Sequence, residues 1–255
     1  MNIQQPKSFN ILLIGDHCED VYQYGTVDRV SPEAPVPVFV PSTEQRKPGM
    51  AGNVCRNLEA LGCNVNYLHG KTTVKTRLID SRSKQQIVRI DSDVMSDPIR
   101  WASEIPESYD AVVVSDYNKG TVDYQTIQEL KEEFAGPIFV DTKKTDLAQL
   151  EGCIVKINEL EHSRLTTQCT QLIVTQGKHG AWYMGKRFGA GSVEVADVCG
   201  AGDTFLAALT FAYLEYKDME LAITFAIEAA SITVQHIGCY APSLAQILER
   251  CNDKT

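Results

Sequence analysis

Short, mainly apolar runs recur along the chain, and polar residues bound each of them. Runs of this length are typical of strands that are buried on both faces in a parallel sheet. They lie at Ile11–Ile14, Ala111–Val114, Ile138–Val140 and Leu172–Thr175. Apolar residues at helical spacing predict helices over Asn53–Leu61, Tyr124–Phe134 and Leu206–Leu214. Strands that alternate with helices indicate an α/β fold with a mostly parallel sheet.

Two segments follow a different pattern. Residues 21–47 are rich in Val, Tyr, Thr and Pro, and so many prolines exclude a central strand or helix but suit edge strands and turns. Residues 72–91 alternate loosely between apolar and polar positions, which predicts a hairpin with its turn near Ser81–Lys84.

The composition is that of an ordinary globular protein. With 255 residues, of which 44% are hydrophobic and 22% charged, the chain can bury a sizeable core in one large domain. Its net charge of −9 argues against a general nucleic-acid binder, whose affinity comes largely from neutralising phosphates. No apolar run is long enough to span a bilayer, and residues 1–10 lack the features of a secretory signal. The eight cysteines are scattered, which favours reduced thiols in the cytoplasm.

The ends of the predicted strands carry candidate ligand-binding residues. Asp16, Asp116, Asp141 and Gly177 each follow one of the apolar runs. Ligands in parallel sheets bind outside the carboxyl ends of the strands, where such residues gather.

The most informative stretch is Asp197–Phe205, in which small residues precede the predicted helix over Leu206–Leu214. Backbone N–H groups converge at such a turn, so it can hold the negative charge of a phosphoryl group in transfer. The Asp203 carboxylate can accept the proton of an attacking hydroxyl. A simple helix N-cap at Asp203 is an equally good interpretation of this segment alone. Walker A and strand-linked G-x-G-x-x-G motifs are absent, which disfavours P-loop enzymes and Rossmann dehydrogenases.

Asp197–Phe205 resembles the C-terminal signature of the ribokinase/PfkB carbohydrate kinases, usually D-T-x-G-A-G-D or D-V-T-G-A-G-D. Cys199 departs from it where Thr is usual, and a thiol is a weaker hydrogen-bond donor than a hydroxyl. The resemblance implies an α/β fold of the ribokinase-like type, a three-layer sandwich with a mostly parallel sheet and a small β lid. It also implies an enzyme that uses ATP and Mg²⁺.

Further motifs follow in family order from about residue 11 to residue 245. Arg29–Val38 and Pro48–Val54 are similar to the heptose 7-phosphate kinase branch, the kinase half of bifunctional ADP-heptose synthesis proteins. Met50 and Gly52 depart from the usual P-G-G-A-A-N-V. Shorter matches lie at Val74–Arg77, Gln85–Asp91, Ser115–Gly120 and Val140–Lys144. The resemblance implies one kinase domain over residues 1–255, with lid segments at about 17–47 and 71–93.

The resemblance assigns roles on the phosphoryl-transfer side. Asp203 is expected to be the catalytic base, with Gly200, Ala201 and Gly202 around the transferred charge. In the N-x-x-E motif, Asn158 is expected to approach the nucleotide phosphates and Glu161 to organise Mg²⁺ through water. The nucleotide-side loop T-x-G-x-x-G is expected to contribute Thr175, Gly177 and Gly180, and residues 226–231 should pack near the adenine. The alternative for the N-x-x-E residues is that they are surface charges of a helix. The alternative for residues 226–231 is that they form a plain core helix.

On the acceptor side, the resemblance implies that the sugar is bound by Asp16, Gly49, Asn53 and Asp116, with Gly49 letting the backbone approach it. Arg77 and Arg89 are expected to bind the substrate's own phosphate, because a guanidinium pairs with it bidentately. The alternatives are a strand-end cap for Asp16, a helix N-cap for Asn53 and exposed hairpin charges for the two arginines. Lys119 and Lys143 have the same ambiguity, and His17 and His179 are interpreted as incidental.

Two stretches of the family pattern are missing. The chain passes from Leu68–Gly70 almost directly into the predicted hairpin, without the usual strand–helix unit, and it is shorter than usual between Glu161 and Gln171. Such a loss exposes a sheet edge. The chain is then either a streamlined kinase or one that no longer turns over. The first is favoured because Asp203, its glycines and the N-x-x-E residues remain.

We therefore expect transfer of the ATP γ-phosphoryl group to the anomeric hydroxyl of D-glycero-D-manno-heptose 7-phosphate, in ADP-heptose synthesis. The expected form is a cytoplasmic homodimer that pairs through the β lid, with no nucleic-acid or membrane partner and no nucleotidyltransferase activity. A kinase of another sugar or sugar phosphate is one alternative. A non-catalytic sugar- or nucleotide-binding relative is the other.

Overall fold

One mixed sheet organises the molecule. The computed structural model describes residues 7–100 and 108–252, and within them the sheet has ten strands. The order is β10-β9-β8-β7-β6-β5-β1-β3-β4, with β2 paired to β1. The run from β8 to β3 is parallel, whereas β2, β4, β9 and β10 pair antiparallel. The strands are β1 (Asn10–Val30), β2 (Pro37–Met50), β3 (Asn64–Asp80), β4 (Gln86–Ser92), β5 (Ala111–Asp116), β6 (Ile138–Thr142), β7 (Ile154–Asn158), β8 (Leu172–Thr175), β9 (Ala181–Tyr183) and β10 (Lys186–Phe188).

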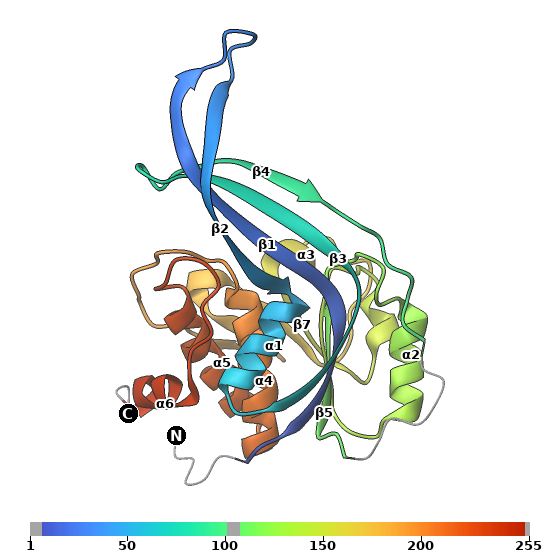
Figure 1. Ribbon diagram of the computed structural model, residues 1–255. Coiled ribbons are helices and arrows are strands. Elements are labelled where there is room, and N and C mark those ends of the chain that lie inside the picture. Colours follow the sequence, from blue (N-terminus) through green and yellow to red (C-terminus); the bar gives the residue numbers. More distant parts are fainter. Residues whose placement is uncertain (1–6, 101–107, 253–255) are drawn as a thin grey trace.

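Helices cover both faces of the sheet, which confirms the predicted α/β fold (Figure 1). They are α1 (Ala51–Ala60), α2 (Tyr124–Glu133), α3 (Glu159–His162), α4 (Ala201–Tyr216), α5 (Met219–Thr233), α6 (Leu244–Asn252) and the 3₁₀ turns η1 (Leu147–Leu150) and η2 (Gly177–His179). Helices α4 and α5 are apolar on nearly all sides, as expected for helices in the middle of a layer. No helix among residues 7–100 and 108–252 is long and apolar enough to cross a membrane.

Alternate residues of the central strands enter two hydrophobic cores. Leu13 and Val113 pack with α1, α4 and α5 in one core. Ile14 and Val114 pack with α2 in the other. Because successive side chains of a strand point to opposite faces, an uninterrupted apolar run is what a strand between two cores requires.

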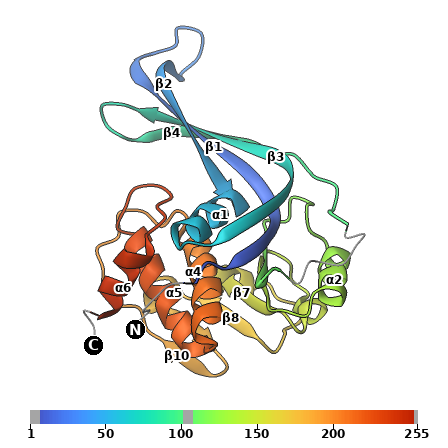
Figure 2. The same ribbon diagram turned by 60° about the horizontal axis from the view of Figure 1, so that its bottom comes forward.

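Part of the sheet extends away from these cores, as Figures 1 and 2 show. We call it the projecting sheet and define it as residues 17–30 of β1, 37–50 of β2, 72–80 of β3 and 86–92 of β4. The predicted lid segments at 17–47 and 71–93 fall largely within it, and the predicted turn near Ser81–Lys84 connects β3 to β4. The prediction that the first strand ends at Gly15–Asp16 is wrong, because β1 continues past an irregularity between Gly15 and His17.

The predicted loss of a strand–helix unit leaves an open edge. The first part of β3, Asn64–His69, pairs with β1, and no other strand in the described part of the chain pairs with it. Strand β3 then runs on into the projecting sheet, where β4 covers its outer side from Val74 to Ile79. That the whole of residues 1–255 is one domain stays a prediction, since its ends lie outside the described residues.

Candidate active site

A glycine begins the helix that carries the predicted base. Gly200 is the N-cap of α4 and has a φ of 76°, a left-handed conformation that favours glycine. A Cβ at Gly200 would also lie 2.7 Å from Nδ2 of Asn53. Asp203 lies in the first turn of α4 and makes no cap hydrogen bond. The interpretation of Asp203 as the N-cap is therefore wrong.

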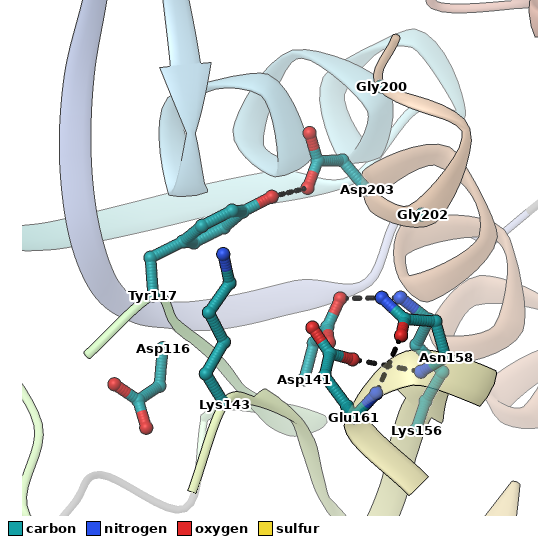
Figure 3. Close-up of a pocket in the computed structure, with 10 residues that line it drawn as sticks. All are labelled: Asp116, Tyr117, Asp141, Lys143, Lys156, Asn158, Glu161, Gly200, Gly202 and Asp203. Carbon is teal, nitrogen blue, oxygen red and sulfur yellow. Dashed lines mark hydrogen bonds and ion pairs between the residues drawn. The ribbon is translucent and has the colours of Figure 1, made fainter. Parts of the chain in front are cut away.

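The Asp203 carboxylate is held between two side chains, Asn53 and Tyr117, of which Figure 3 draws Tyr117. Its Oδ2 accepts a hydrogen bond of 2.8 Å from Nδ2 of Asn53, and its Oδ1 accepts one of 2.8 Å from the Tyr117 hydroxyl. Asp203 is 5% exposed. Burial raises the pKa of Asp203 to about 6, although both hydrogen bonds oppose the change. The carboxyl can therefore change its protonation state close to neutral pH.

A cavity of about 170 Å³ opens beside Asp203, and a buried lysine lies in its wall. Its lining residues are Asp116, Tyr117, Asp141, Lys143, Lys156, Asn158, Glu161, Gly200, Gly202 and Asp203. The Lys156 ammonium donates to Asp141 at 2.6 Å and lies 3.0 Å from the point where a Cβ on Gly202 would be. Burial lowers the pKa of Lys156, but the carboxylates of Asp141, Asp203 and Glu161 together outweigh it, so the net shift is upward. A permanent cation therefore lies at the N-terminal turn of α4.

The two N-x-x-E residues bond to each other at the start of α3. The Asn158 side chain accepts from the backbone N–H of Glu161 at 2.9 Å, and the Glu161 carboxylate accepts from the N–H of Asn158 at 2.8 Å. This capping box aims both side chains at the cavity. Burial raises the pKa of Glu161, and the neighbouring Asp141 adds to the shift. A nearby cation would relieve the repulsion between these two carboxylates.

Oxygen ligands for Mg²⁺ are present here, but the protein does not form a complete cage. No group of three or more His, Cys, Asp or Glu side chains in residues 7–100 and 108–252 is arranged to hold a metal ion. Mg²⁺ usually binds through one or two carboxylates together with water and substrate phosphates. The Asp141 and Glu161 carboxylates in the cavity wall fit that mode.

A second cavity, of about 480 Å³, adjoins the first at Gly202, which lines both. The structure brings the predicted nucleotide-side residues together there: Thr175, Gly177, Gly180, Ala230 and Ser231 all line it. Apolar side chains, among them Val195, Phe205 and Ile227, form much of the remaining wall. A cavity of this size and character can hold a flat, mostly apolar group beside the polar cavity.

Two predicted sugar-binding residues are instead engaged with the protein. Asp16 is 1% exposed and accepts backbone hydrogen bonds from Tyr117, Lys119 and Thr121 at 2.8, 2.9 and 3.2 Å. Asp116 is buried and accepts from Thr142 at 2.6 Å and from Lys144 at 2.8 Å. In the structure these carboxylates hold in place the loop that presents Tyr117, and Asp116 also lines the small cavity. That the two carboxylates bind sugar hydroxyls stays a prediction.

Asp20, which the sequence analysis did not single out, lies beside Gly49, one of the predicted sugar-binding residues. It is 7% exposed, and any Cβ on Gly49 would overlap its Oδ2. The absence of a side chain at Gly49 therefore lets the Asp20 carboxylate lie close to the backbone of β2. Asn53 donates to Asp203, and its own Oδ1 is buried without a hydrogen-bond partner. One feature of the sequence could have pointed to Asp20. It alternates with the apolar Cys18 and the aromatic Tyr22, so the three side chains lie on the same face of one strand.

The predicted phosphate-binding arginines both have carboxylate partners. Arg77 pairs with Asp20, and both side chains are largely buried. Arg89 pairs with Asp91 at 2.7 Å. Lys119 pairs with Asp93 at 2.5 Å, whereas the Lys143 ammonium lies 4.7 Å from the centre of the Tyr117 ring and lines the smaller cavity.

Comparisons with known proteins agree with this geometry. The family model described as "pfkB family carbohydrate kinase" matches residues 123–246. The bifunctional protein HldE of Helicobacter acinonychis (strain Sheeba) is 31% identical over 304 aligned residues, which cover 93% of this chain and 65% of that protein. HldE of Hydrogenovibrio crunogenus is 29% identical over 313 residues, with 99% and 65% covered. The chain thus spans just under two thirds of these relatives, and both alignments are longer than its 255 residues, which agrees with the predicted shortening.

Solved structures show the same fold. Phosphofructokinase-2 from Escherichia coli matches with a TM-score of 0.72 at 15% identity, covering 98% of this chain and all of that one. Ribokinase from Thermotoga maritima matches with a TM-score of 0.68 at 16% identity, covering 96% of this chain and 100% of that one. At these identities the likeness concerns the fold alone, and it confirms the predicted ribokinase-like architecture.

Proposed function

The chain belongs to the pfkB family of carbohydrate kinases, and we propose that it transfers the γ-phosphoryl group of ATP to the anomeric hydroxyl of D-glycero-D-manno-heptose 7-phosphate. One observation carries the proposal. A buried carboxylate, Asp203, and a buried ammonium, Lys156, border the same small cavity at the N-terminus of α4. Phosphoryl transfer needs a base for the acceptor and positive charge for the transferred group, side by side.

Asp203 is the base. The acceptor O–H gives its proton to the Asp203 carboxylate as the oxygen forms a bond to the γ-phosphorus, and ADP leaves with the bridging oxygen. A pKa of about 6 leaves the carboxyl mostly ionised at neutral pH and still able to hold a proton. Asn53 and Tyr117 fix its orientation, and each carboxylate oxygen keeps a second lone pair for the acceptor.

Positive charge for the transferred phosphoryl group comes from two sources in the chain. The backbone N–H groups at Gly200–Gly202 begin α4 and carry partial positive charge. The Lys156 ammonium lies beside Gly202. Asn158, Asp141 and Glu161 would hold Mg²⁺ together with the nucleotide phosphates, and bound Mg²⁺ would neutralise part of the phosphate charge. The 480 Å³ cavity beside Gly202 would receive the nucleoside of ATP.

The heptose assignment is supported by sequence and relatives. Arg29–Val38 and Pro48–Val54 match the heptose 7-phosphate kinase branch, and curated relatives of about this identity are named bifunctional protein HldE. The chain spans 65% of the length of the first of those relatives. The identity of its acceptor and its place in ADP-heptose synthesis are therefore part of the proposal.

An assay of ADP formation with a panel of sugars and sugar phosphates tests the proposal, with the wild-type chain compared to Asp203→Asn. We expect turnover with heptose 7-phosphate and a loss of roughly 10²- to 10⁴-fold in kcat for Asp203→Asn, the usual contribution of a general base. Turnover only with other acceptors would support the kinase assignment and contradict the assignment of heptose 7-phosphate as the acceptor. Binding of ATP without turnover on any sugar would contradict the enzyme assignment, and an unaffected Asp203→Asn would remove the base.

The proposal includes a homodimer through the projecting sheet. Its outward face exposes apolar side chains, with Val88 at 45% and Ile90 at 51%. Burying them against a second copy would remove apolar surface from water. Sedimentation velocity should give a dimer for the wild-type chain and a monomer for Ile90→Lys. A monomeric wild-type chain at micromolar concentration would contradict this part.

A further inference from the structure

Helices α1 and α4 lie side by side, and two hydrogen bonds join them beside the proposed base (Figures 1 and 2). The first joins Nδ2 of Asn53 to Oδ2 of Asp203 at 2.8 Å. In the second, the Thr204 hydroxyl donates to Oδ1 of Asn57 at 2.9 Å. Asp203 and Thr204 are neighbours on α4, and Asn53 and Asn57 are one turn apart on the same face of α1. The base therefore belongs to one of two adjacent links between the helices.

The chemistry of the groups fixes which atoms donate in the second link. The Asn57 side chain also lies 2.8 Å from the backbone oxygen of Asn53. That oxygen can only accept, so the Asn57 amide nitrogen must face it and Oδ1 must face Thr204. The single hydrogen of the Thr204 hydroxyl is then used on Asn57, and its oxygen accepts from the Thr233 hydroxyl at 3.0 Å. The bonds therefore run in one direction, from α5 through α4 to α1.

This network is closed to water. Asn57 and Thr204 are each 2% exposed, and Asn53 and Thr233 are fully buried. A buried polar group that loses its partner costs the full penalty of its desolvation, so such a network strongly favours one arrangement of the helices. Asn57 and Thr204 line neither cavity, so any part they have in the reaction is exerted through the residues that they hold.

The first turn of α1 depends on this link for its position. Within residues 7–100 and 108–252, its N-cap residue Met50 makes no side-chain cap hydrogen bond, and Oδ1 of Asn53 is buried without a partner. Apolar side chains such as Leu58 pack α1 into the same core as α4, but apolar contact is non-directional and does not fix the register of one helix on another. Nδ2 of Asn53 also lies only 2.7 Å from the Cβ position of Gly200. A small displacement of α1 would therefore disturb the bond to Asp203.

We propose that Asn57 and Thr204 are positioning residues for the base, because they set the place of Asn53 and so the hydrogen bond that Asn53 donates to Asp203. The inference rests on the proposed kinase function only for the role of Asp203 as base, since the bonds themselves belong to the folded chain. Without the second link, Asp203 would lose a donor that favours its ionised form. The carboxylate would then take up a proton at higher pH and could rotate away from the acceptor.

Two variants break the link, and two more test the cause of the effect. Thr204→Val removes the donor and keeps the shape of the side chain, and Asn57→Leu removes the acceptor. Thr204→Ser keeps the hydroxyl and loses only the methyl group. Thr210→Val is the matched control, because Thr210 is also buried on α4 and its hydroxyl bonds the Leu206 carbonyl of the same helix at 3.0 Å.

The first measurement is the pKa of Asp203 itself. A pH titration of the chain labelled with ¹³C at its aspartate carboxyl groups gives this pKa, and Asp203→Asn identifies the resonance. The titration needs neither substrate nor turnover. The pKa of Asp203 is about 6 in the wild type, and we expect Thr204→Val and Asn57→Leu to raise it by roughly one pH unit, as for the loss of most of a hydrogen bond to a charged group. Thr204→Ser and Thr210→Val should leave it in place.

The second measurement is ADP formation over a range of pH. In Thr204→Val and Asn57→Leu, the acidic limb of kcat should move to higher pH together with the pKa of Asp203. At pH 8 their kcat should fall by about 10-fold, since a displacement of about 1 Å can cost up to about 100-fold. The KM for ATP should not change, because neither residue lines the 480 Å³ cavity. Residues with a merely structural role would lower the unfolding temperature without moving the limb.

The inference is overturned if the pKa of Asp203 in Thr204→Val and Asn57→Leu equals that of the wild type, or if Thr210→Val raises it equally. It is also overturned if Thr204→Ser raises this pKa as much as Thr204→Val does. Absence of ADP formation with every sugar would reject the kinase function, and the titration would still decide the inference. Thermal unfolding shows which variants are folded at the temperature of the titration, and Asn57→Leu carries the test if Thr204→Val is not.

Discussion

The small cavity at α4 and one face of the projecting sheet both carry many charges, but they compensate them differently. Pairing across β2, β1, β3 and β4 places Lys47, Asp20, Lys75 and Asp91 on this face, with Arg77 and Arg89 in the next row, and we call it the cleft face. In the cavity, Lys156 is bonded to Asp141 and Asp203 is held by two side chains. On the cleft face, Lys47 and Lys75 have no ion-pair partner in the described part of the chain. A fully buried charge must be paired within the protein, whereas a half-exposed charge can be stabilised by hydration. The cavity therefore holds its charged groups in fixed positions, whereas the cleft face leaves two lysines without an ion pair in the described part of the chain.

The two regions also differ in how much apolar packing surrounds them. The cavity lies at the ends of strands that are packed between two hydrophobic cores. The projecting sheet extends beyond both cores, and many of its side chains are exposed. Regions with few buried apolar contacts open more easily. Substitutions should therefore affect rate in the cavity and acceptor affinity on the projecting sheet.

The largest effect is expected for Lys156→Met. It removes the cation beside the transferred phosphoryl group and leaves Asp141 buried without its partner. We expect kcat to fall by roughly 10²- to 10³-fold, and the free energy of unfolding to fall by about 3–5 kcal/mol. Steady-state assays and denaturant unfolding measure the two quantities.

Arg250→Met is the control, because it breaks a largely buried pair with Glu228 whose two residues line neither cavity. It should cost similar stability and much less kcat. Equal losses of kcat in both variants would show that Lys156 acts through stability alone.

An intermediate effect is expected for Gly49→Ala, at the junction of the two regions. The added Cβ would overlap the Asp20 carboxylate and push it away from its present place. A displacement of about 1 Å at a positioning residue can cost up to about 100-fold, so we expect the KM for the acceptor to rise by about 10-fold or more while the KM for ATP changes little. Gly189→Ala is the control, since a Cβ there meets open space. An unchanged acceptor KM would mean that Asp20 does not contact the sugar.

The smallest effect is expected for Tyr117→Phe, and it appears in the pH profile. Asp203 must be ionised to act as a base, so activity should fall as the pH drops through about 6. The Tyr117 hydroxyl stabilises the carboxylate, and its removal should raise the pKa of Asp203 and move the acidic limb to higher pH. At pH 8 the loss in kcat should stay below about 10-fold. A limb that stays in place, or moves to lower pH, would contradict the assignment of this limb to Asp203.

Most elements of the α/β core could be predicted because their apolar runs are uninterrupted. Strand β7 was not predicted, since Lys156 stands in the middle of it. A lysine inside an apolar run argues against a buried strand unless a carboxylate partner is known. The partner of Lys156 is Asp141, which belongs to another strand and cannot be recognised from the local sequence. The same residue that hid the strand is thus the cation of the proposed site.

The acceptor side was predicted less well, for a related reason. Asp16 follows an apolar run and was expected at a strand end, but β1 continues for a further 14 residues to Val30. Whether a carboxylate faces a ligand or three backbone N–H groups depends on which loop lies against it. That loop, around Tyr117, comes from about 100 positions further along the chain.

The sequence by itself determined the alternation of strands and helices and the family motif at Gly200–Asp203, because local periodicity and short spacings are written in neighbouring residues. Only the tertiary structure decided which charges are free. Asp16, Asp116, Arg77 and Arg89 look available in the sequence and are paired in the fold, whereas Lys47 and Lys75 become distinctive only when four strands bring them beside carboxylates already in use. Pairing between charges acts over a few ångströms in space, and distance in space is what a linear sequence does not contain.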